Sequence, residues 1–168
     1  MSSGIQNKHN NAGTKKYLCF SLGGESYAVP LLAVREVIAV PEITPVPHTP
    51  SHFLGIMNLR GQVISIIDLR TKFGLKAELT SRSAVIVCDL SPISLGIVVN
   101  SINAVLSISD QDIQPKPDIA SNKNTAYITG VSKQGERLVL LLDLAKALDV
   151  EDLVAAREAQ QAPQAKTA

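Results

Sequence analysis

Two histidines four residues apart are the first side chains whose types and spacing could do chemistry. His48 and His52 have the separation of two metal ligands on one face of a helix. Pro47 and Pro50 disfavour a regular helix at this point, and no cysteine or carboxylate lies beside either histidine. We therefore expect two exposed loop histidines and no metal site.

Three aspartates each end an aliphatic run, and paired carboxylates can serve as general acid and base. These are Asp68, Asp89 and Asp143, and no histidine, lysine or tyrosine adjoins any of them. A carboxylate after a strand more simply caps the next helical turn, because it accepts hydrogen bonds from free backbone N–H groups. The motifs of phosphate loops, dinucleotide-binding turns and hydrolase elbows are absent from the sequence. We expect no catalytic residue, no cofactor and no enzyme.

Arg60 is the remaining candidate, because it stands at a tight turn between Asn58 and Gly61. An arginine held on a rigid hairpin can offer a two-pronged donor to a carboxylate or backbone of a partner. A solvated turn arginine with no partner is the alternative, and the residue pattern alone leaves both open. Arg35 and Glu36 are the only charges within the apolar stretch from residue 31 to residue 38.

The element that positions Arg60 is a predicted β-hairpin over residues 55–70, hinged at Arg60-Gly61. It recurs in weaker form over residues 130–144, and in both copies Gly and Asp-Leu keep the same spacing. When the two copies are aligned, Gln134-Gly135 corresponds only loosely to Arg60-Gly61. Further matches join residues 27–38 to 95–106, and Pro45 and Pro47 to Pro115 and Pro117. The repeat predicts two similar β modules, and short strands of this kind suit small closed barrels.

Local signals place the other elements. Gly23-Gly24 predicts a hairpin turn between strands at 17–22 and 25–30, and strands are also expected at 83–90 and 94–99 across Ser91-Pro92. Residues 68–73 predict one helical turn that Gly74 ends. We expect a disordered tail over residues 1–15, a domain over 16–150, and a C-terminal helix with a flexible end over 151–168.

Composition narrows the class of protein. The 168 residues are 45% hydrophobic and 4% aromatic with no tryptophan, so the core must be aliphatic. A net charge of +1 gives no basic footprint for nucleic acid. No apolar run is long enough to span a bilayer. Cys19 and Cys88 lie far apart in apolar runs, so we expect two buried free thiols.

The sequence resembles the CheW family of chemotaxis coupling proteins from about Tyr17 to Leu148. The most specific motif is Asn58-Leu59-Arg60-Gly61. The other matching segments, in chain order, are Tyr27-Ala28-Val29-Pro30, Val34-Arg35-Glu36-Val37-Ile38, Ile43-Thr44-Pro45-Val46-Pro47, Thr49-Pro50, Phe53, Gly55-Ile56-Met57, Asp68-Leu69-Arg70, Phe73-Gly74, Gly96-Ile97-Val98-Val99, Val105-Leu106, Ile113-Gln114-Pro115, Tyr127-Ile128-Thr129-Gly130 and Leu140-Leu141-Leu142-Asp143.

The resemblance implies an all-β fold of two SH3-like five-stranded β-barrels packed side by side, with short helical turns and a C-terminal helix. It implies a cytoplasmic, non-enzymatic scaffold, recruited to membrane-associated arrays. There it would couple the cytoplasmic tips of transmembrane chemoreceptors (methyl-accepting chemotaxis proteins) to the regulatory domain of the histidine kinase CheA. The same adaptor module in a non-flagellar chemosensory pathway, serving twitching motility or gene regulation, stays open.

In the family the receptor tip docks near the groove between the barrels. The positions of this chain that match the family's partner-binding residues are Val34, Glu36, Gly55, Asn58, Arg60, Val98 and Val105. The resemblance does not divide them between receptor and kinase. Two positions depart from the family pattern. Ser65 stands where proline is usual, which we expect to loosen an edge strand, and Asn100 replaces an aspartate near the groove.

Overall fold

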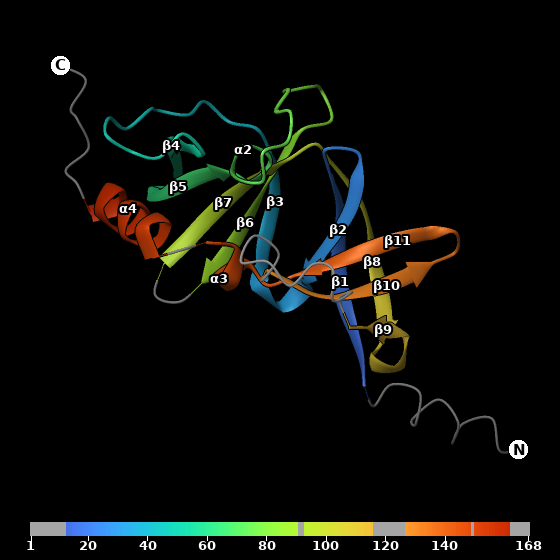
Figure 1. Cartoon of the computed structure of the whole chain (residues 1–168). Helices are drawn as coiled ribbons and strands as arrows, with labels where there is room; N and C mark the ends of the chain where they lie inside the picture. Colours follow the sequence, from blue (N-terminus) through green and yellow to red (C-terminus); the bar gives the residue numbers. More distant parts are fainter. Residues whose placement is uncertain (1–12, 91–92, 116–126, 149, 162–168) are drawn as a thin grey trace, which may run out of the picture.

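The computed structural model describes residues 13–90, 93–115, 127–148 and 150–161, which form two β-sheets lying side by side (Figure 1). The six-stranded sheet has the order β8 (Ser101–Ser109), β1 (Thr14–Leu22), β2 (Glu25–Pro30), β11 (Arg137–Leu142), β10 (Ile128–Gln134) and β9 (Ile113–Gln114). The five-stranded sheet has the order β3 (Val34–Ala39), β6 (Ala84–Leu90), β7 (Ile93–Val99), β5 (Gln62–Asp68) and β4 (Phe53–Leu59). The helical segments are η1 (Leu31–Ala33), α2 (Leu69–Lys72), η2 (Asp110–Asp112), α3 (Leu144–Ala147) and α4 (Val150–Gln161).

Several expected features lie wholly or largely outside the described residues. These are most of the N-terminal tail, the turn at 91–92, Pro117 and the end of the chain from residue 162. The first strand, β1, begins at Thr14.

The internal repeat is present, and its strands are exchanged between the sheets. The β1–β2 hairpin joins β11 in parallel, with Tyr27 opposite Leu140. The β6–β7 hairpin joins β5 in the same way, with Leu95 opposite Ser65. Each sheet therefore contains a hairpin from one repeat and three main strands from the other. Because each repeat needs strands of the other to complete its sheet, the two halves interlock.

The hairpin turns carry the positive φ angles that two-residue connections require. Gly23 and Gly24 have φ of 58° and 90°, which confirms the predicted first turn. Arg60 and Gly61 have φ of 51° and 88°. In the second copy Gln134 pairs with Arg137, so the turn is Gly135-Glu136. Gly135 is thus the counterpart of Arg60, one residue away from the alignment expected from sequence.

Two of the three aspartates cap helical turns as predicted. Asp68 accepts a hydrogen bond from the Arg70 N–H, and Asp143 accepts one from the Lys146 N–H. The prediction is wrong for Asp89, which lies within β6. Its carboxylate accepts from the Ser94 hydroxyl at 2.7 Å and pairs with Arg35 at 2.8 Å. The β6 strand pairs with β7 through to Leu90, so Asp89 still lies in the sheet ladder and has no helix to cap.

Three hydrophobic clusters form the core. The central one joins facing side chains of both sheets, among them Leu18, Val29, Ile86 and Ile97. A second lies within the six-stranded sheet, and a third, which includes Val98, within the five-stranded sheet. Both cysteines are buried and free, as predicted. Burial raises the pKa of the Cys88 thiol to about 12, so this side chain is a packing residue.

Helix α4 folds back onto β4, β5 and β7, and it explains the departure at Ser65. The strand β5 lies between β7 and β4, so the expectation of a loosened edge strand is wrong. Ser65 is fully buried, and its hydroxyl donates to the Ala156 carbonyl at 3.0 Å. Asn100, the other departure, accepts a hydrogen bond from the Gly23 N–H at 3.0 Å, which supports the first turn.

The same helix corrects the expectation for one histidine. His48 is exposed as predicted. His52 is not, because its side chain is only 15% exposed and pairs with Asp152 of α4. Lys72 pairs with the same carboxylate, which is 1% exposed. The partners lie far apart in the sequence, so the local pattern around His52 carries no sign of them.

Candidate partner-binding site

Arg60 stands at the exposed tip of the β4–β5 hairpin. The turn is braced from within, because the Asn58 side-chain oxygen accepts a hydrogen bond from the Gly61 N–H at 2.8 Å. A residue with a side chain is less favourable than glycine at a φ of 51°. The backbone of Arg60 is therefore strained at the position where the hairpin exposes a guanidinium, which makes this residue a candidate functional residue.

The guanidinium of Arg60 reaches the opposite edge of its own sheet. Its Nη2 donates to Glu36 Oε1 on β3, although β3 and β4 are the two outer strands of the five-stranded sheet. The sheet therefore curls until its edges approach, as an SH3-like fold requires. The Arg60 side chain is 70% exposed and that of Glu36 is 25% exposed. Within the described residues Glu36 is the hydrogen-bond partner of Arg60, so the remaining N–H groups of the Arg60 guanidinium are directed to solvent.

Arg35 strengthens the same end of the sheet, and it was not among the predicted partner-binding residues. It lies at a register shift in the β3–β6 pairing. Its guanidinium donates to Gln62 at 2.8 Å, to Ser94 at 3.0 Å and to Asp89. The Ser94 hydroxyl and the Arg35 guanidinium hold the pKa of the Asp89 carboxyl below its usual value. The charge of Arg35 within an apolar stretch was the signal available in the sequence.

The structure brings three of the predicted partner-binding residues together and separates the other four. Glu36, Asn58 and Arg60 share the exposed end of the five-stranded sheet. Val34 begins β3 and packs partly against the central core. Val105 lies on β8 of the other sheet and is 53% exposed.

Gly55 and Val98 are buried, and each has a clear role in the fold. A Cβ on Gly55 would lie 2.1 Å from the Thr44 carbonyl oxygen, and its φ is 146°. This close approach allows the bridge between Thr44 and Ile56. Val98 has no exposed surface and belongs to the core of the five-stranded sheet.

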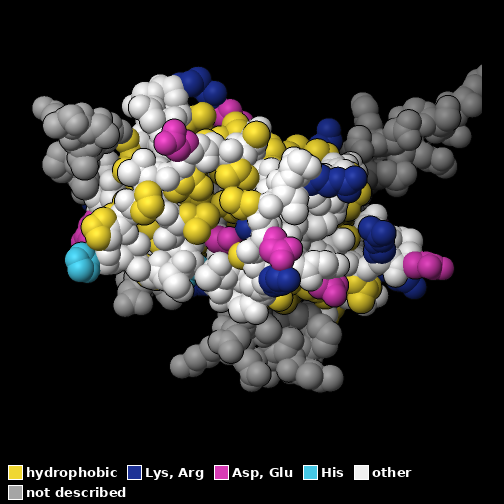
Figure 2. All heavy atoms as spheres, turned by 90° about the horizontal axis from the view of Figure 1, so that it is seen from above, with side chains coloured by type: hydrophobic (Ala, Val, Ile, Leu, Met, Phe, Trp, Pro, Cys, Tyr) yellow, Lys and Arg dark blue, Asp and Glu magenta, His cyan; other side chains and the backbone are white. Residues whose placement is uncertain are grey.

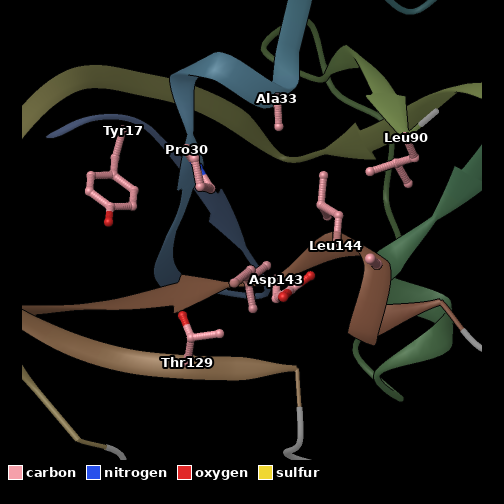
Figure 3. Close-up of a pocket in the computed structure, with 9 residues that line it drawn as sticks. Tyr17, Pro30, Ala33, Leu90, Thr129, Asp143 and Leu144 are labelled. Carbon is pink, nitrogen blue, oxygen red and sulfur yellow. The ribbon is translucent and has the colours of Figure 1, made fainter.

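Two surface features had no sequence signal. Leu32 in η1 is fully exposed, although leucine usually prefers burial. A pocket of about 240 Å³ also opens near the ends of β2 and β11, beside α3 (Figure 3). Its walls come from segments scattered along the whole chain, so no local motif could reveal it.

Hydrophobic side chains gather on one face of the molecule. Seen from above, they cover much of the half that carries the five-stranded sheet, whereas most charged groups on this face lie toward the other half (Figure 2). Apolar surface rimmed by polar groups is typical of protein interaction sites. Across the described residues, no helix has the length and apolar character needed to cross a membrane.

Two interlocked SH3-like sheets with an exposed, braced arginine at one end define a small two-module β-protein. The family model for the CheW-like domain matches residues 16–152, and the chain belongs to this family. It is a chemotaxis coupling protein, as comparisons with named relatives also indicate.

Those relatives cover most of the chain. The chain is 36% identical over 150 residues to the chemotaxis protein CheW of Rhizobium meliloti, covering 89% of this chain and 97% of that protein. It is 36% identical over 140 residues to CheW of Klebsiella aerogenes, covering 83% and 84% respectively. The crystal structure of the scaffolding protein TtCheW from Thermoanaerobacter tengcongensis superposes with a TM-score of 0.76 at 31% identity, covering 82% of this chain and 94% of that one.

Proposed function

We propose that this protein links the cytoplasmic tips of chemoreceptors to the regulatory domain of the histidine kinase CheA, and that it acts by binding alone. Family membership supports the coupling role, and the exposed Arg60–Glu36 pair is the observation that carries the assignment of the surface. The protein would act in the cytoplasm and join receptor arrays at the membrane through these contacts.

The predicted partner-binding residues take different parts in this proposal. Glu36, Asn58 and Arg60 form a polar contact that fixes register and choice of partner. Val34 and Val105 add apolar contact area, which supplies much of the affinity at interfaces. Gly55 and Val98 have no side chain available to a partner, so they act by shaping the surface. Binding energy concentrated in a few arginine and aromatic side chains is common at such interfaces.

The test is co-sedimentation of the full chain with receptor-containing membranes, with and without the kinase. We expect Arg60→Glu to reduce the co-sedimented fraction about tenfold or more, because it loses a charge-assisted contact and adds a repulsive charge. The matched control is Arg137→Glu, which reverses an exposed charge next to the counterpart turn on β11. Unchanged thermal unfolding of both variants would show that the fold persists.

A charge-swapped variant separates contact from positioning. Glu36→Arg combined with Arg60→Glu can rebuild the ion pair within the sheet, but it presents the partner with reversed charges. We expect this double variant to stay as weak as Arg60→Glu. Recovery of binding would mean that the pair only shapes the sheet, and equal binding by Arg60→Glu and the control would remove the proposed surface.

A further inference from the structure

The pocket beside α3 has apolar walls and a single acid. Pro30, Leu142 and Leu144 contribute apolar surface, Tyr17 contributes an aromatic ring, and Asp143 contributes a carboxylate (Figure 3). The lining residues include no lysine, arginine or histidine. The internal repeat offers a comparison, because the counterpart of Asp143 after the five-stranded sheet is paired with an arginine of the protein itself.

The counterpart of Asp143 is Asp68, and the two have nearly the same backbone. Each caps the helical turn after its hairpin, with φ and ψ of −100° and 104° at Asp68 and −105° and 108° at Asp143. Their N–H groups donate to the matching carbonyls of His52 and Tyr127, both at 2.8 Å. The neighbouring strands also match. Asp68 lies opposite Val98 of β7 in a parallel pairing. The parallel pairing of β11 with β2 ends with Leu141 opposite Ala28, so Asp143, two residues further on, is in register with Pro30.

Arg70 fills the chamber beside Asp68. Its Nε lies 3.0 Å from Asp68 Oδ1 and its Nη2 lies 3.0 Å from Oδ2, a bidentate pair. The side chain is 1% exposed, and its Nη1 donates to the Glu78 carbonyl at 2.7 Å. The segment after α2 therefore closes this chamber over the guanidinium.

The residue that matches Arg70 after the six-stranded sheet is Ala145 of α3, and no described side chain takes the place of the guanidinium there. In the part of the chain that the structure describes, the Asp143 carboxylate accepts only the Lys146 N–H, at 3.3 Å. Helix α4, which follows α3 in the chain, packs on β4, β5 and β7 of the other sheet. Asp143 thus lines a pocket, whereas the equivalent carboxylate of Asp68 is paired with a guanidinium.

We propose that this pocket binds the guanidinium of an arginine side chain presented by a partner protein. Asp143 would hold it as Asp68 holds Arg70, while the apolar walls receive the aliphatic stem and the Tyr17 ring offers a face for the planar group. A free amino acid is disfavoured, because the pocket has no basic group for its carboxylate.

The probe is arginine capped as N-acetyl-arginine N-methylamide, titrated into the full chain and followed by amide chemical shifts in NMR. We expect saturable shifts at Thr129 and at residues 143–145, and no comparable shifts with capped citrulline, which has the same shape without the charge. Free L-arginine should bind more weakly than the capped form. Equal shifts from capped citrulline, or shifts away from the pocket, would overturn the proposal, and tighter binding of free L-arginine would overturn the assignment to a protein partner.

Two variants complete the test. Asp143→Asn keeps a good helix cap and should weaken capped arginine about tenfold, because a charged acceptor is lost. Glu136→Gln, which removes an exposed charge at the β10–β11 turn, should leave binding unchanged. Ala145→Arg should fill the pocket from within and abolish probe binding. If that variant fails to fold, Asp143→Asn still decides the matter, and undiminished binding by it would refute the site. Neither receptor nor kinase is needed, so the outcome is independent of the proposed coupling role.

Discussion

The five-stranded and six-stranded sheets share a backbone plan and differ in where they carry charge. Strand order, parallel pairing and the register shifts at Gly55 and Gly130 are the same in both. The five-stranded sheet adds three ion pairs, Glu36–Arg60, Arg35–Asp89 and Asp68–Arg70. The strand pairings identify the residues of the six-stranded sheet that are equivalent to each member of these ion pairs.

None of the three ion pairs has a charged counterpart among the described residues of the six-stranded sheet. Ala104 and Gly135 replace Glu36 and Arg60. Asn103 lies at the matching register shift on β8, and it bonds to Ser21 at 3.1 Å with no charge involved. Asp143 keeps its carboxylate, but its arginine is missing. A sheet of this plan therefore forms without these ion pairs, as the six-stranded sheet shows. Arg60 is the exposed arginine of the set, so it is the strongest candidate for a role in binding.

Among the variants that test this comparison, removal of the buried Arg70 should have the largest effect on stability. Arg70→Ala leaves Asp68, which is 3% exposed, without its cation. We expect the free energy of unfolding to fall by about 3–5 kcal/mol, because an unpaired buried charge is costly. Urea denaturation followed by circular dichroism measures it. The double variant Asp68→Asn with Arg70→Met should recover part of the loss, and a loss below about 1 kcal/mol for Arg70→Ala would show that the pair is dispensable.

Gly55 and Gly130, which lie at equivalent register shifts, should differ in how much a substitution by alanine lowers the stability. Gly55→Ala should cost about 2–4 kcal/mol, because its Cβ would meet the Thr44 carbonyl and its φ is positive. At Gly130 an added Cβ would lie 2.6 Å from the Ile113 Cγ2 but no nearer than 3.1 Å to a backbone carbonyl, that of Gln114, and no positive φ is involved. We expect about 1 kcal/mol there, since a side-chain methyl can shift more easily than a backbone carbonyl. Equal thermal unfolding of the two variants would contradict this asymmetry.

Local sequence signals predicted the elements well, because hairpin turns and caps depend on neighbouring residues. Gly23-Gly24, Arg60-Gly61 and the capping aspartates at 68 and 143 are of this kind. The exchange of strands between sheets was not predictable in this way. It rests on parallel pairing between segments far apart in the chain, such as β2 with β11. The contacts of His52 and Ser65 with α4 are missed for the same reason.

The candidate site was predicted in part. Arg60 could be singled out because the second hairpin has no arginine at its turn, and this comparison needs only the sequence. The pocket could not be found, although Asp-Leu-Arg and Asp-Leu-Ala both stand in the sequence. The meaning of that difference depends on Arg70 being buried against Asp68, and burial follows from the fold of the segment that covers it.

The smallest effect belongs to the exposed pair Arg35–Asp89, whose counterpart Asn103–Ser21 is neutral. Hydrogen bonding from Ser94 and the charge of Arg35 lower the pKa of Asp89 from its ordinary value of 3.8. The folded state thus favours the carboxylate, and the stabilisation is complete above the ordinary pKa and is lost as pH falls through the lower folded value. We expect Asp89→Asn to cost no more than about 0.5 kcal/mol at neutral pH, because half-exposed pairs are screened.

The difference in the free energy of unfolding between Asp89→Asn and the unmodified protein should shrink as the solution is acidified below the ordinary carboxyl pKa, because the Asp89 carboxyl then becomes protonated. Asn103→Ala is the matched control on the other sheet. It removes a neutral hydrogen bond, so its effect on urea unfolding should stay constant over the same pH range. A constant difference for Asp89→Asn would mean that the two pairs are equivalent hydrogen bonds, and that charge at this position contributes nothing to the five-stranded sheet.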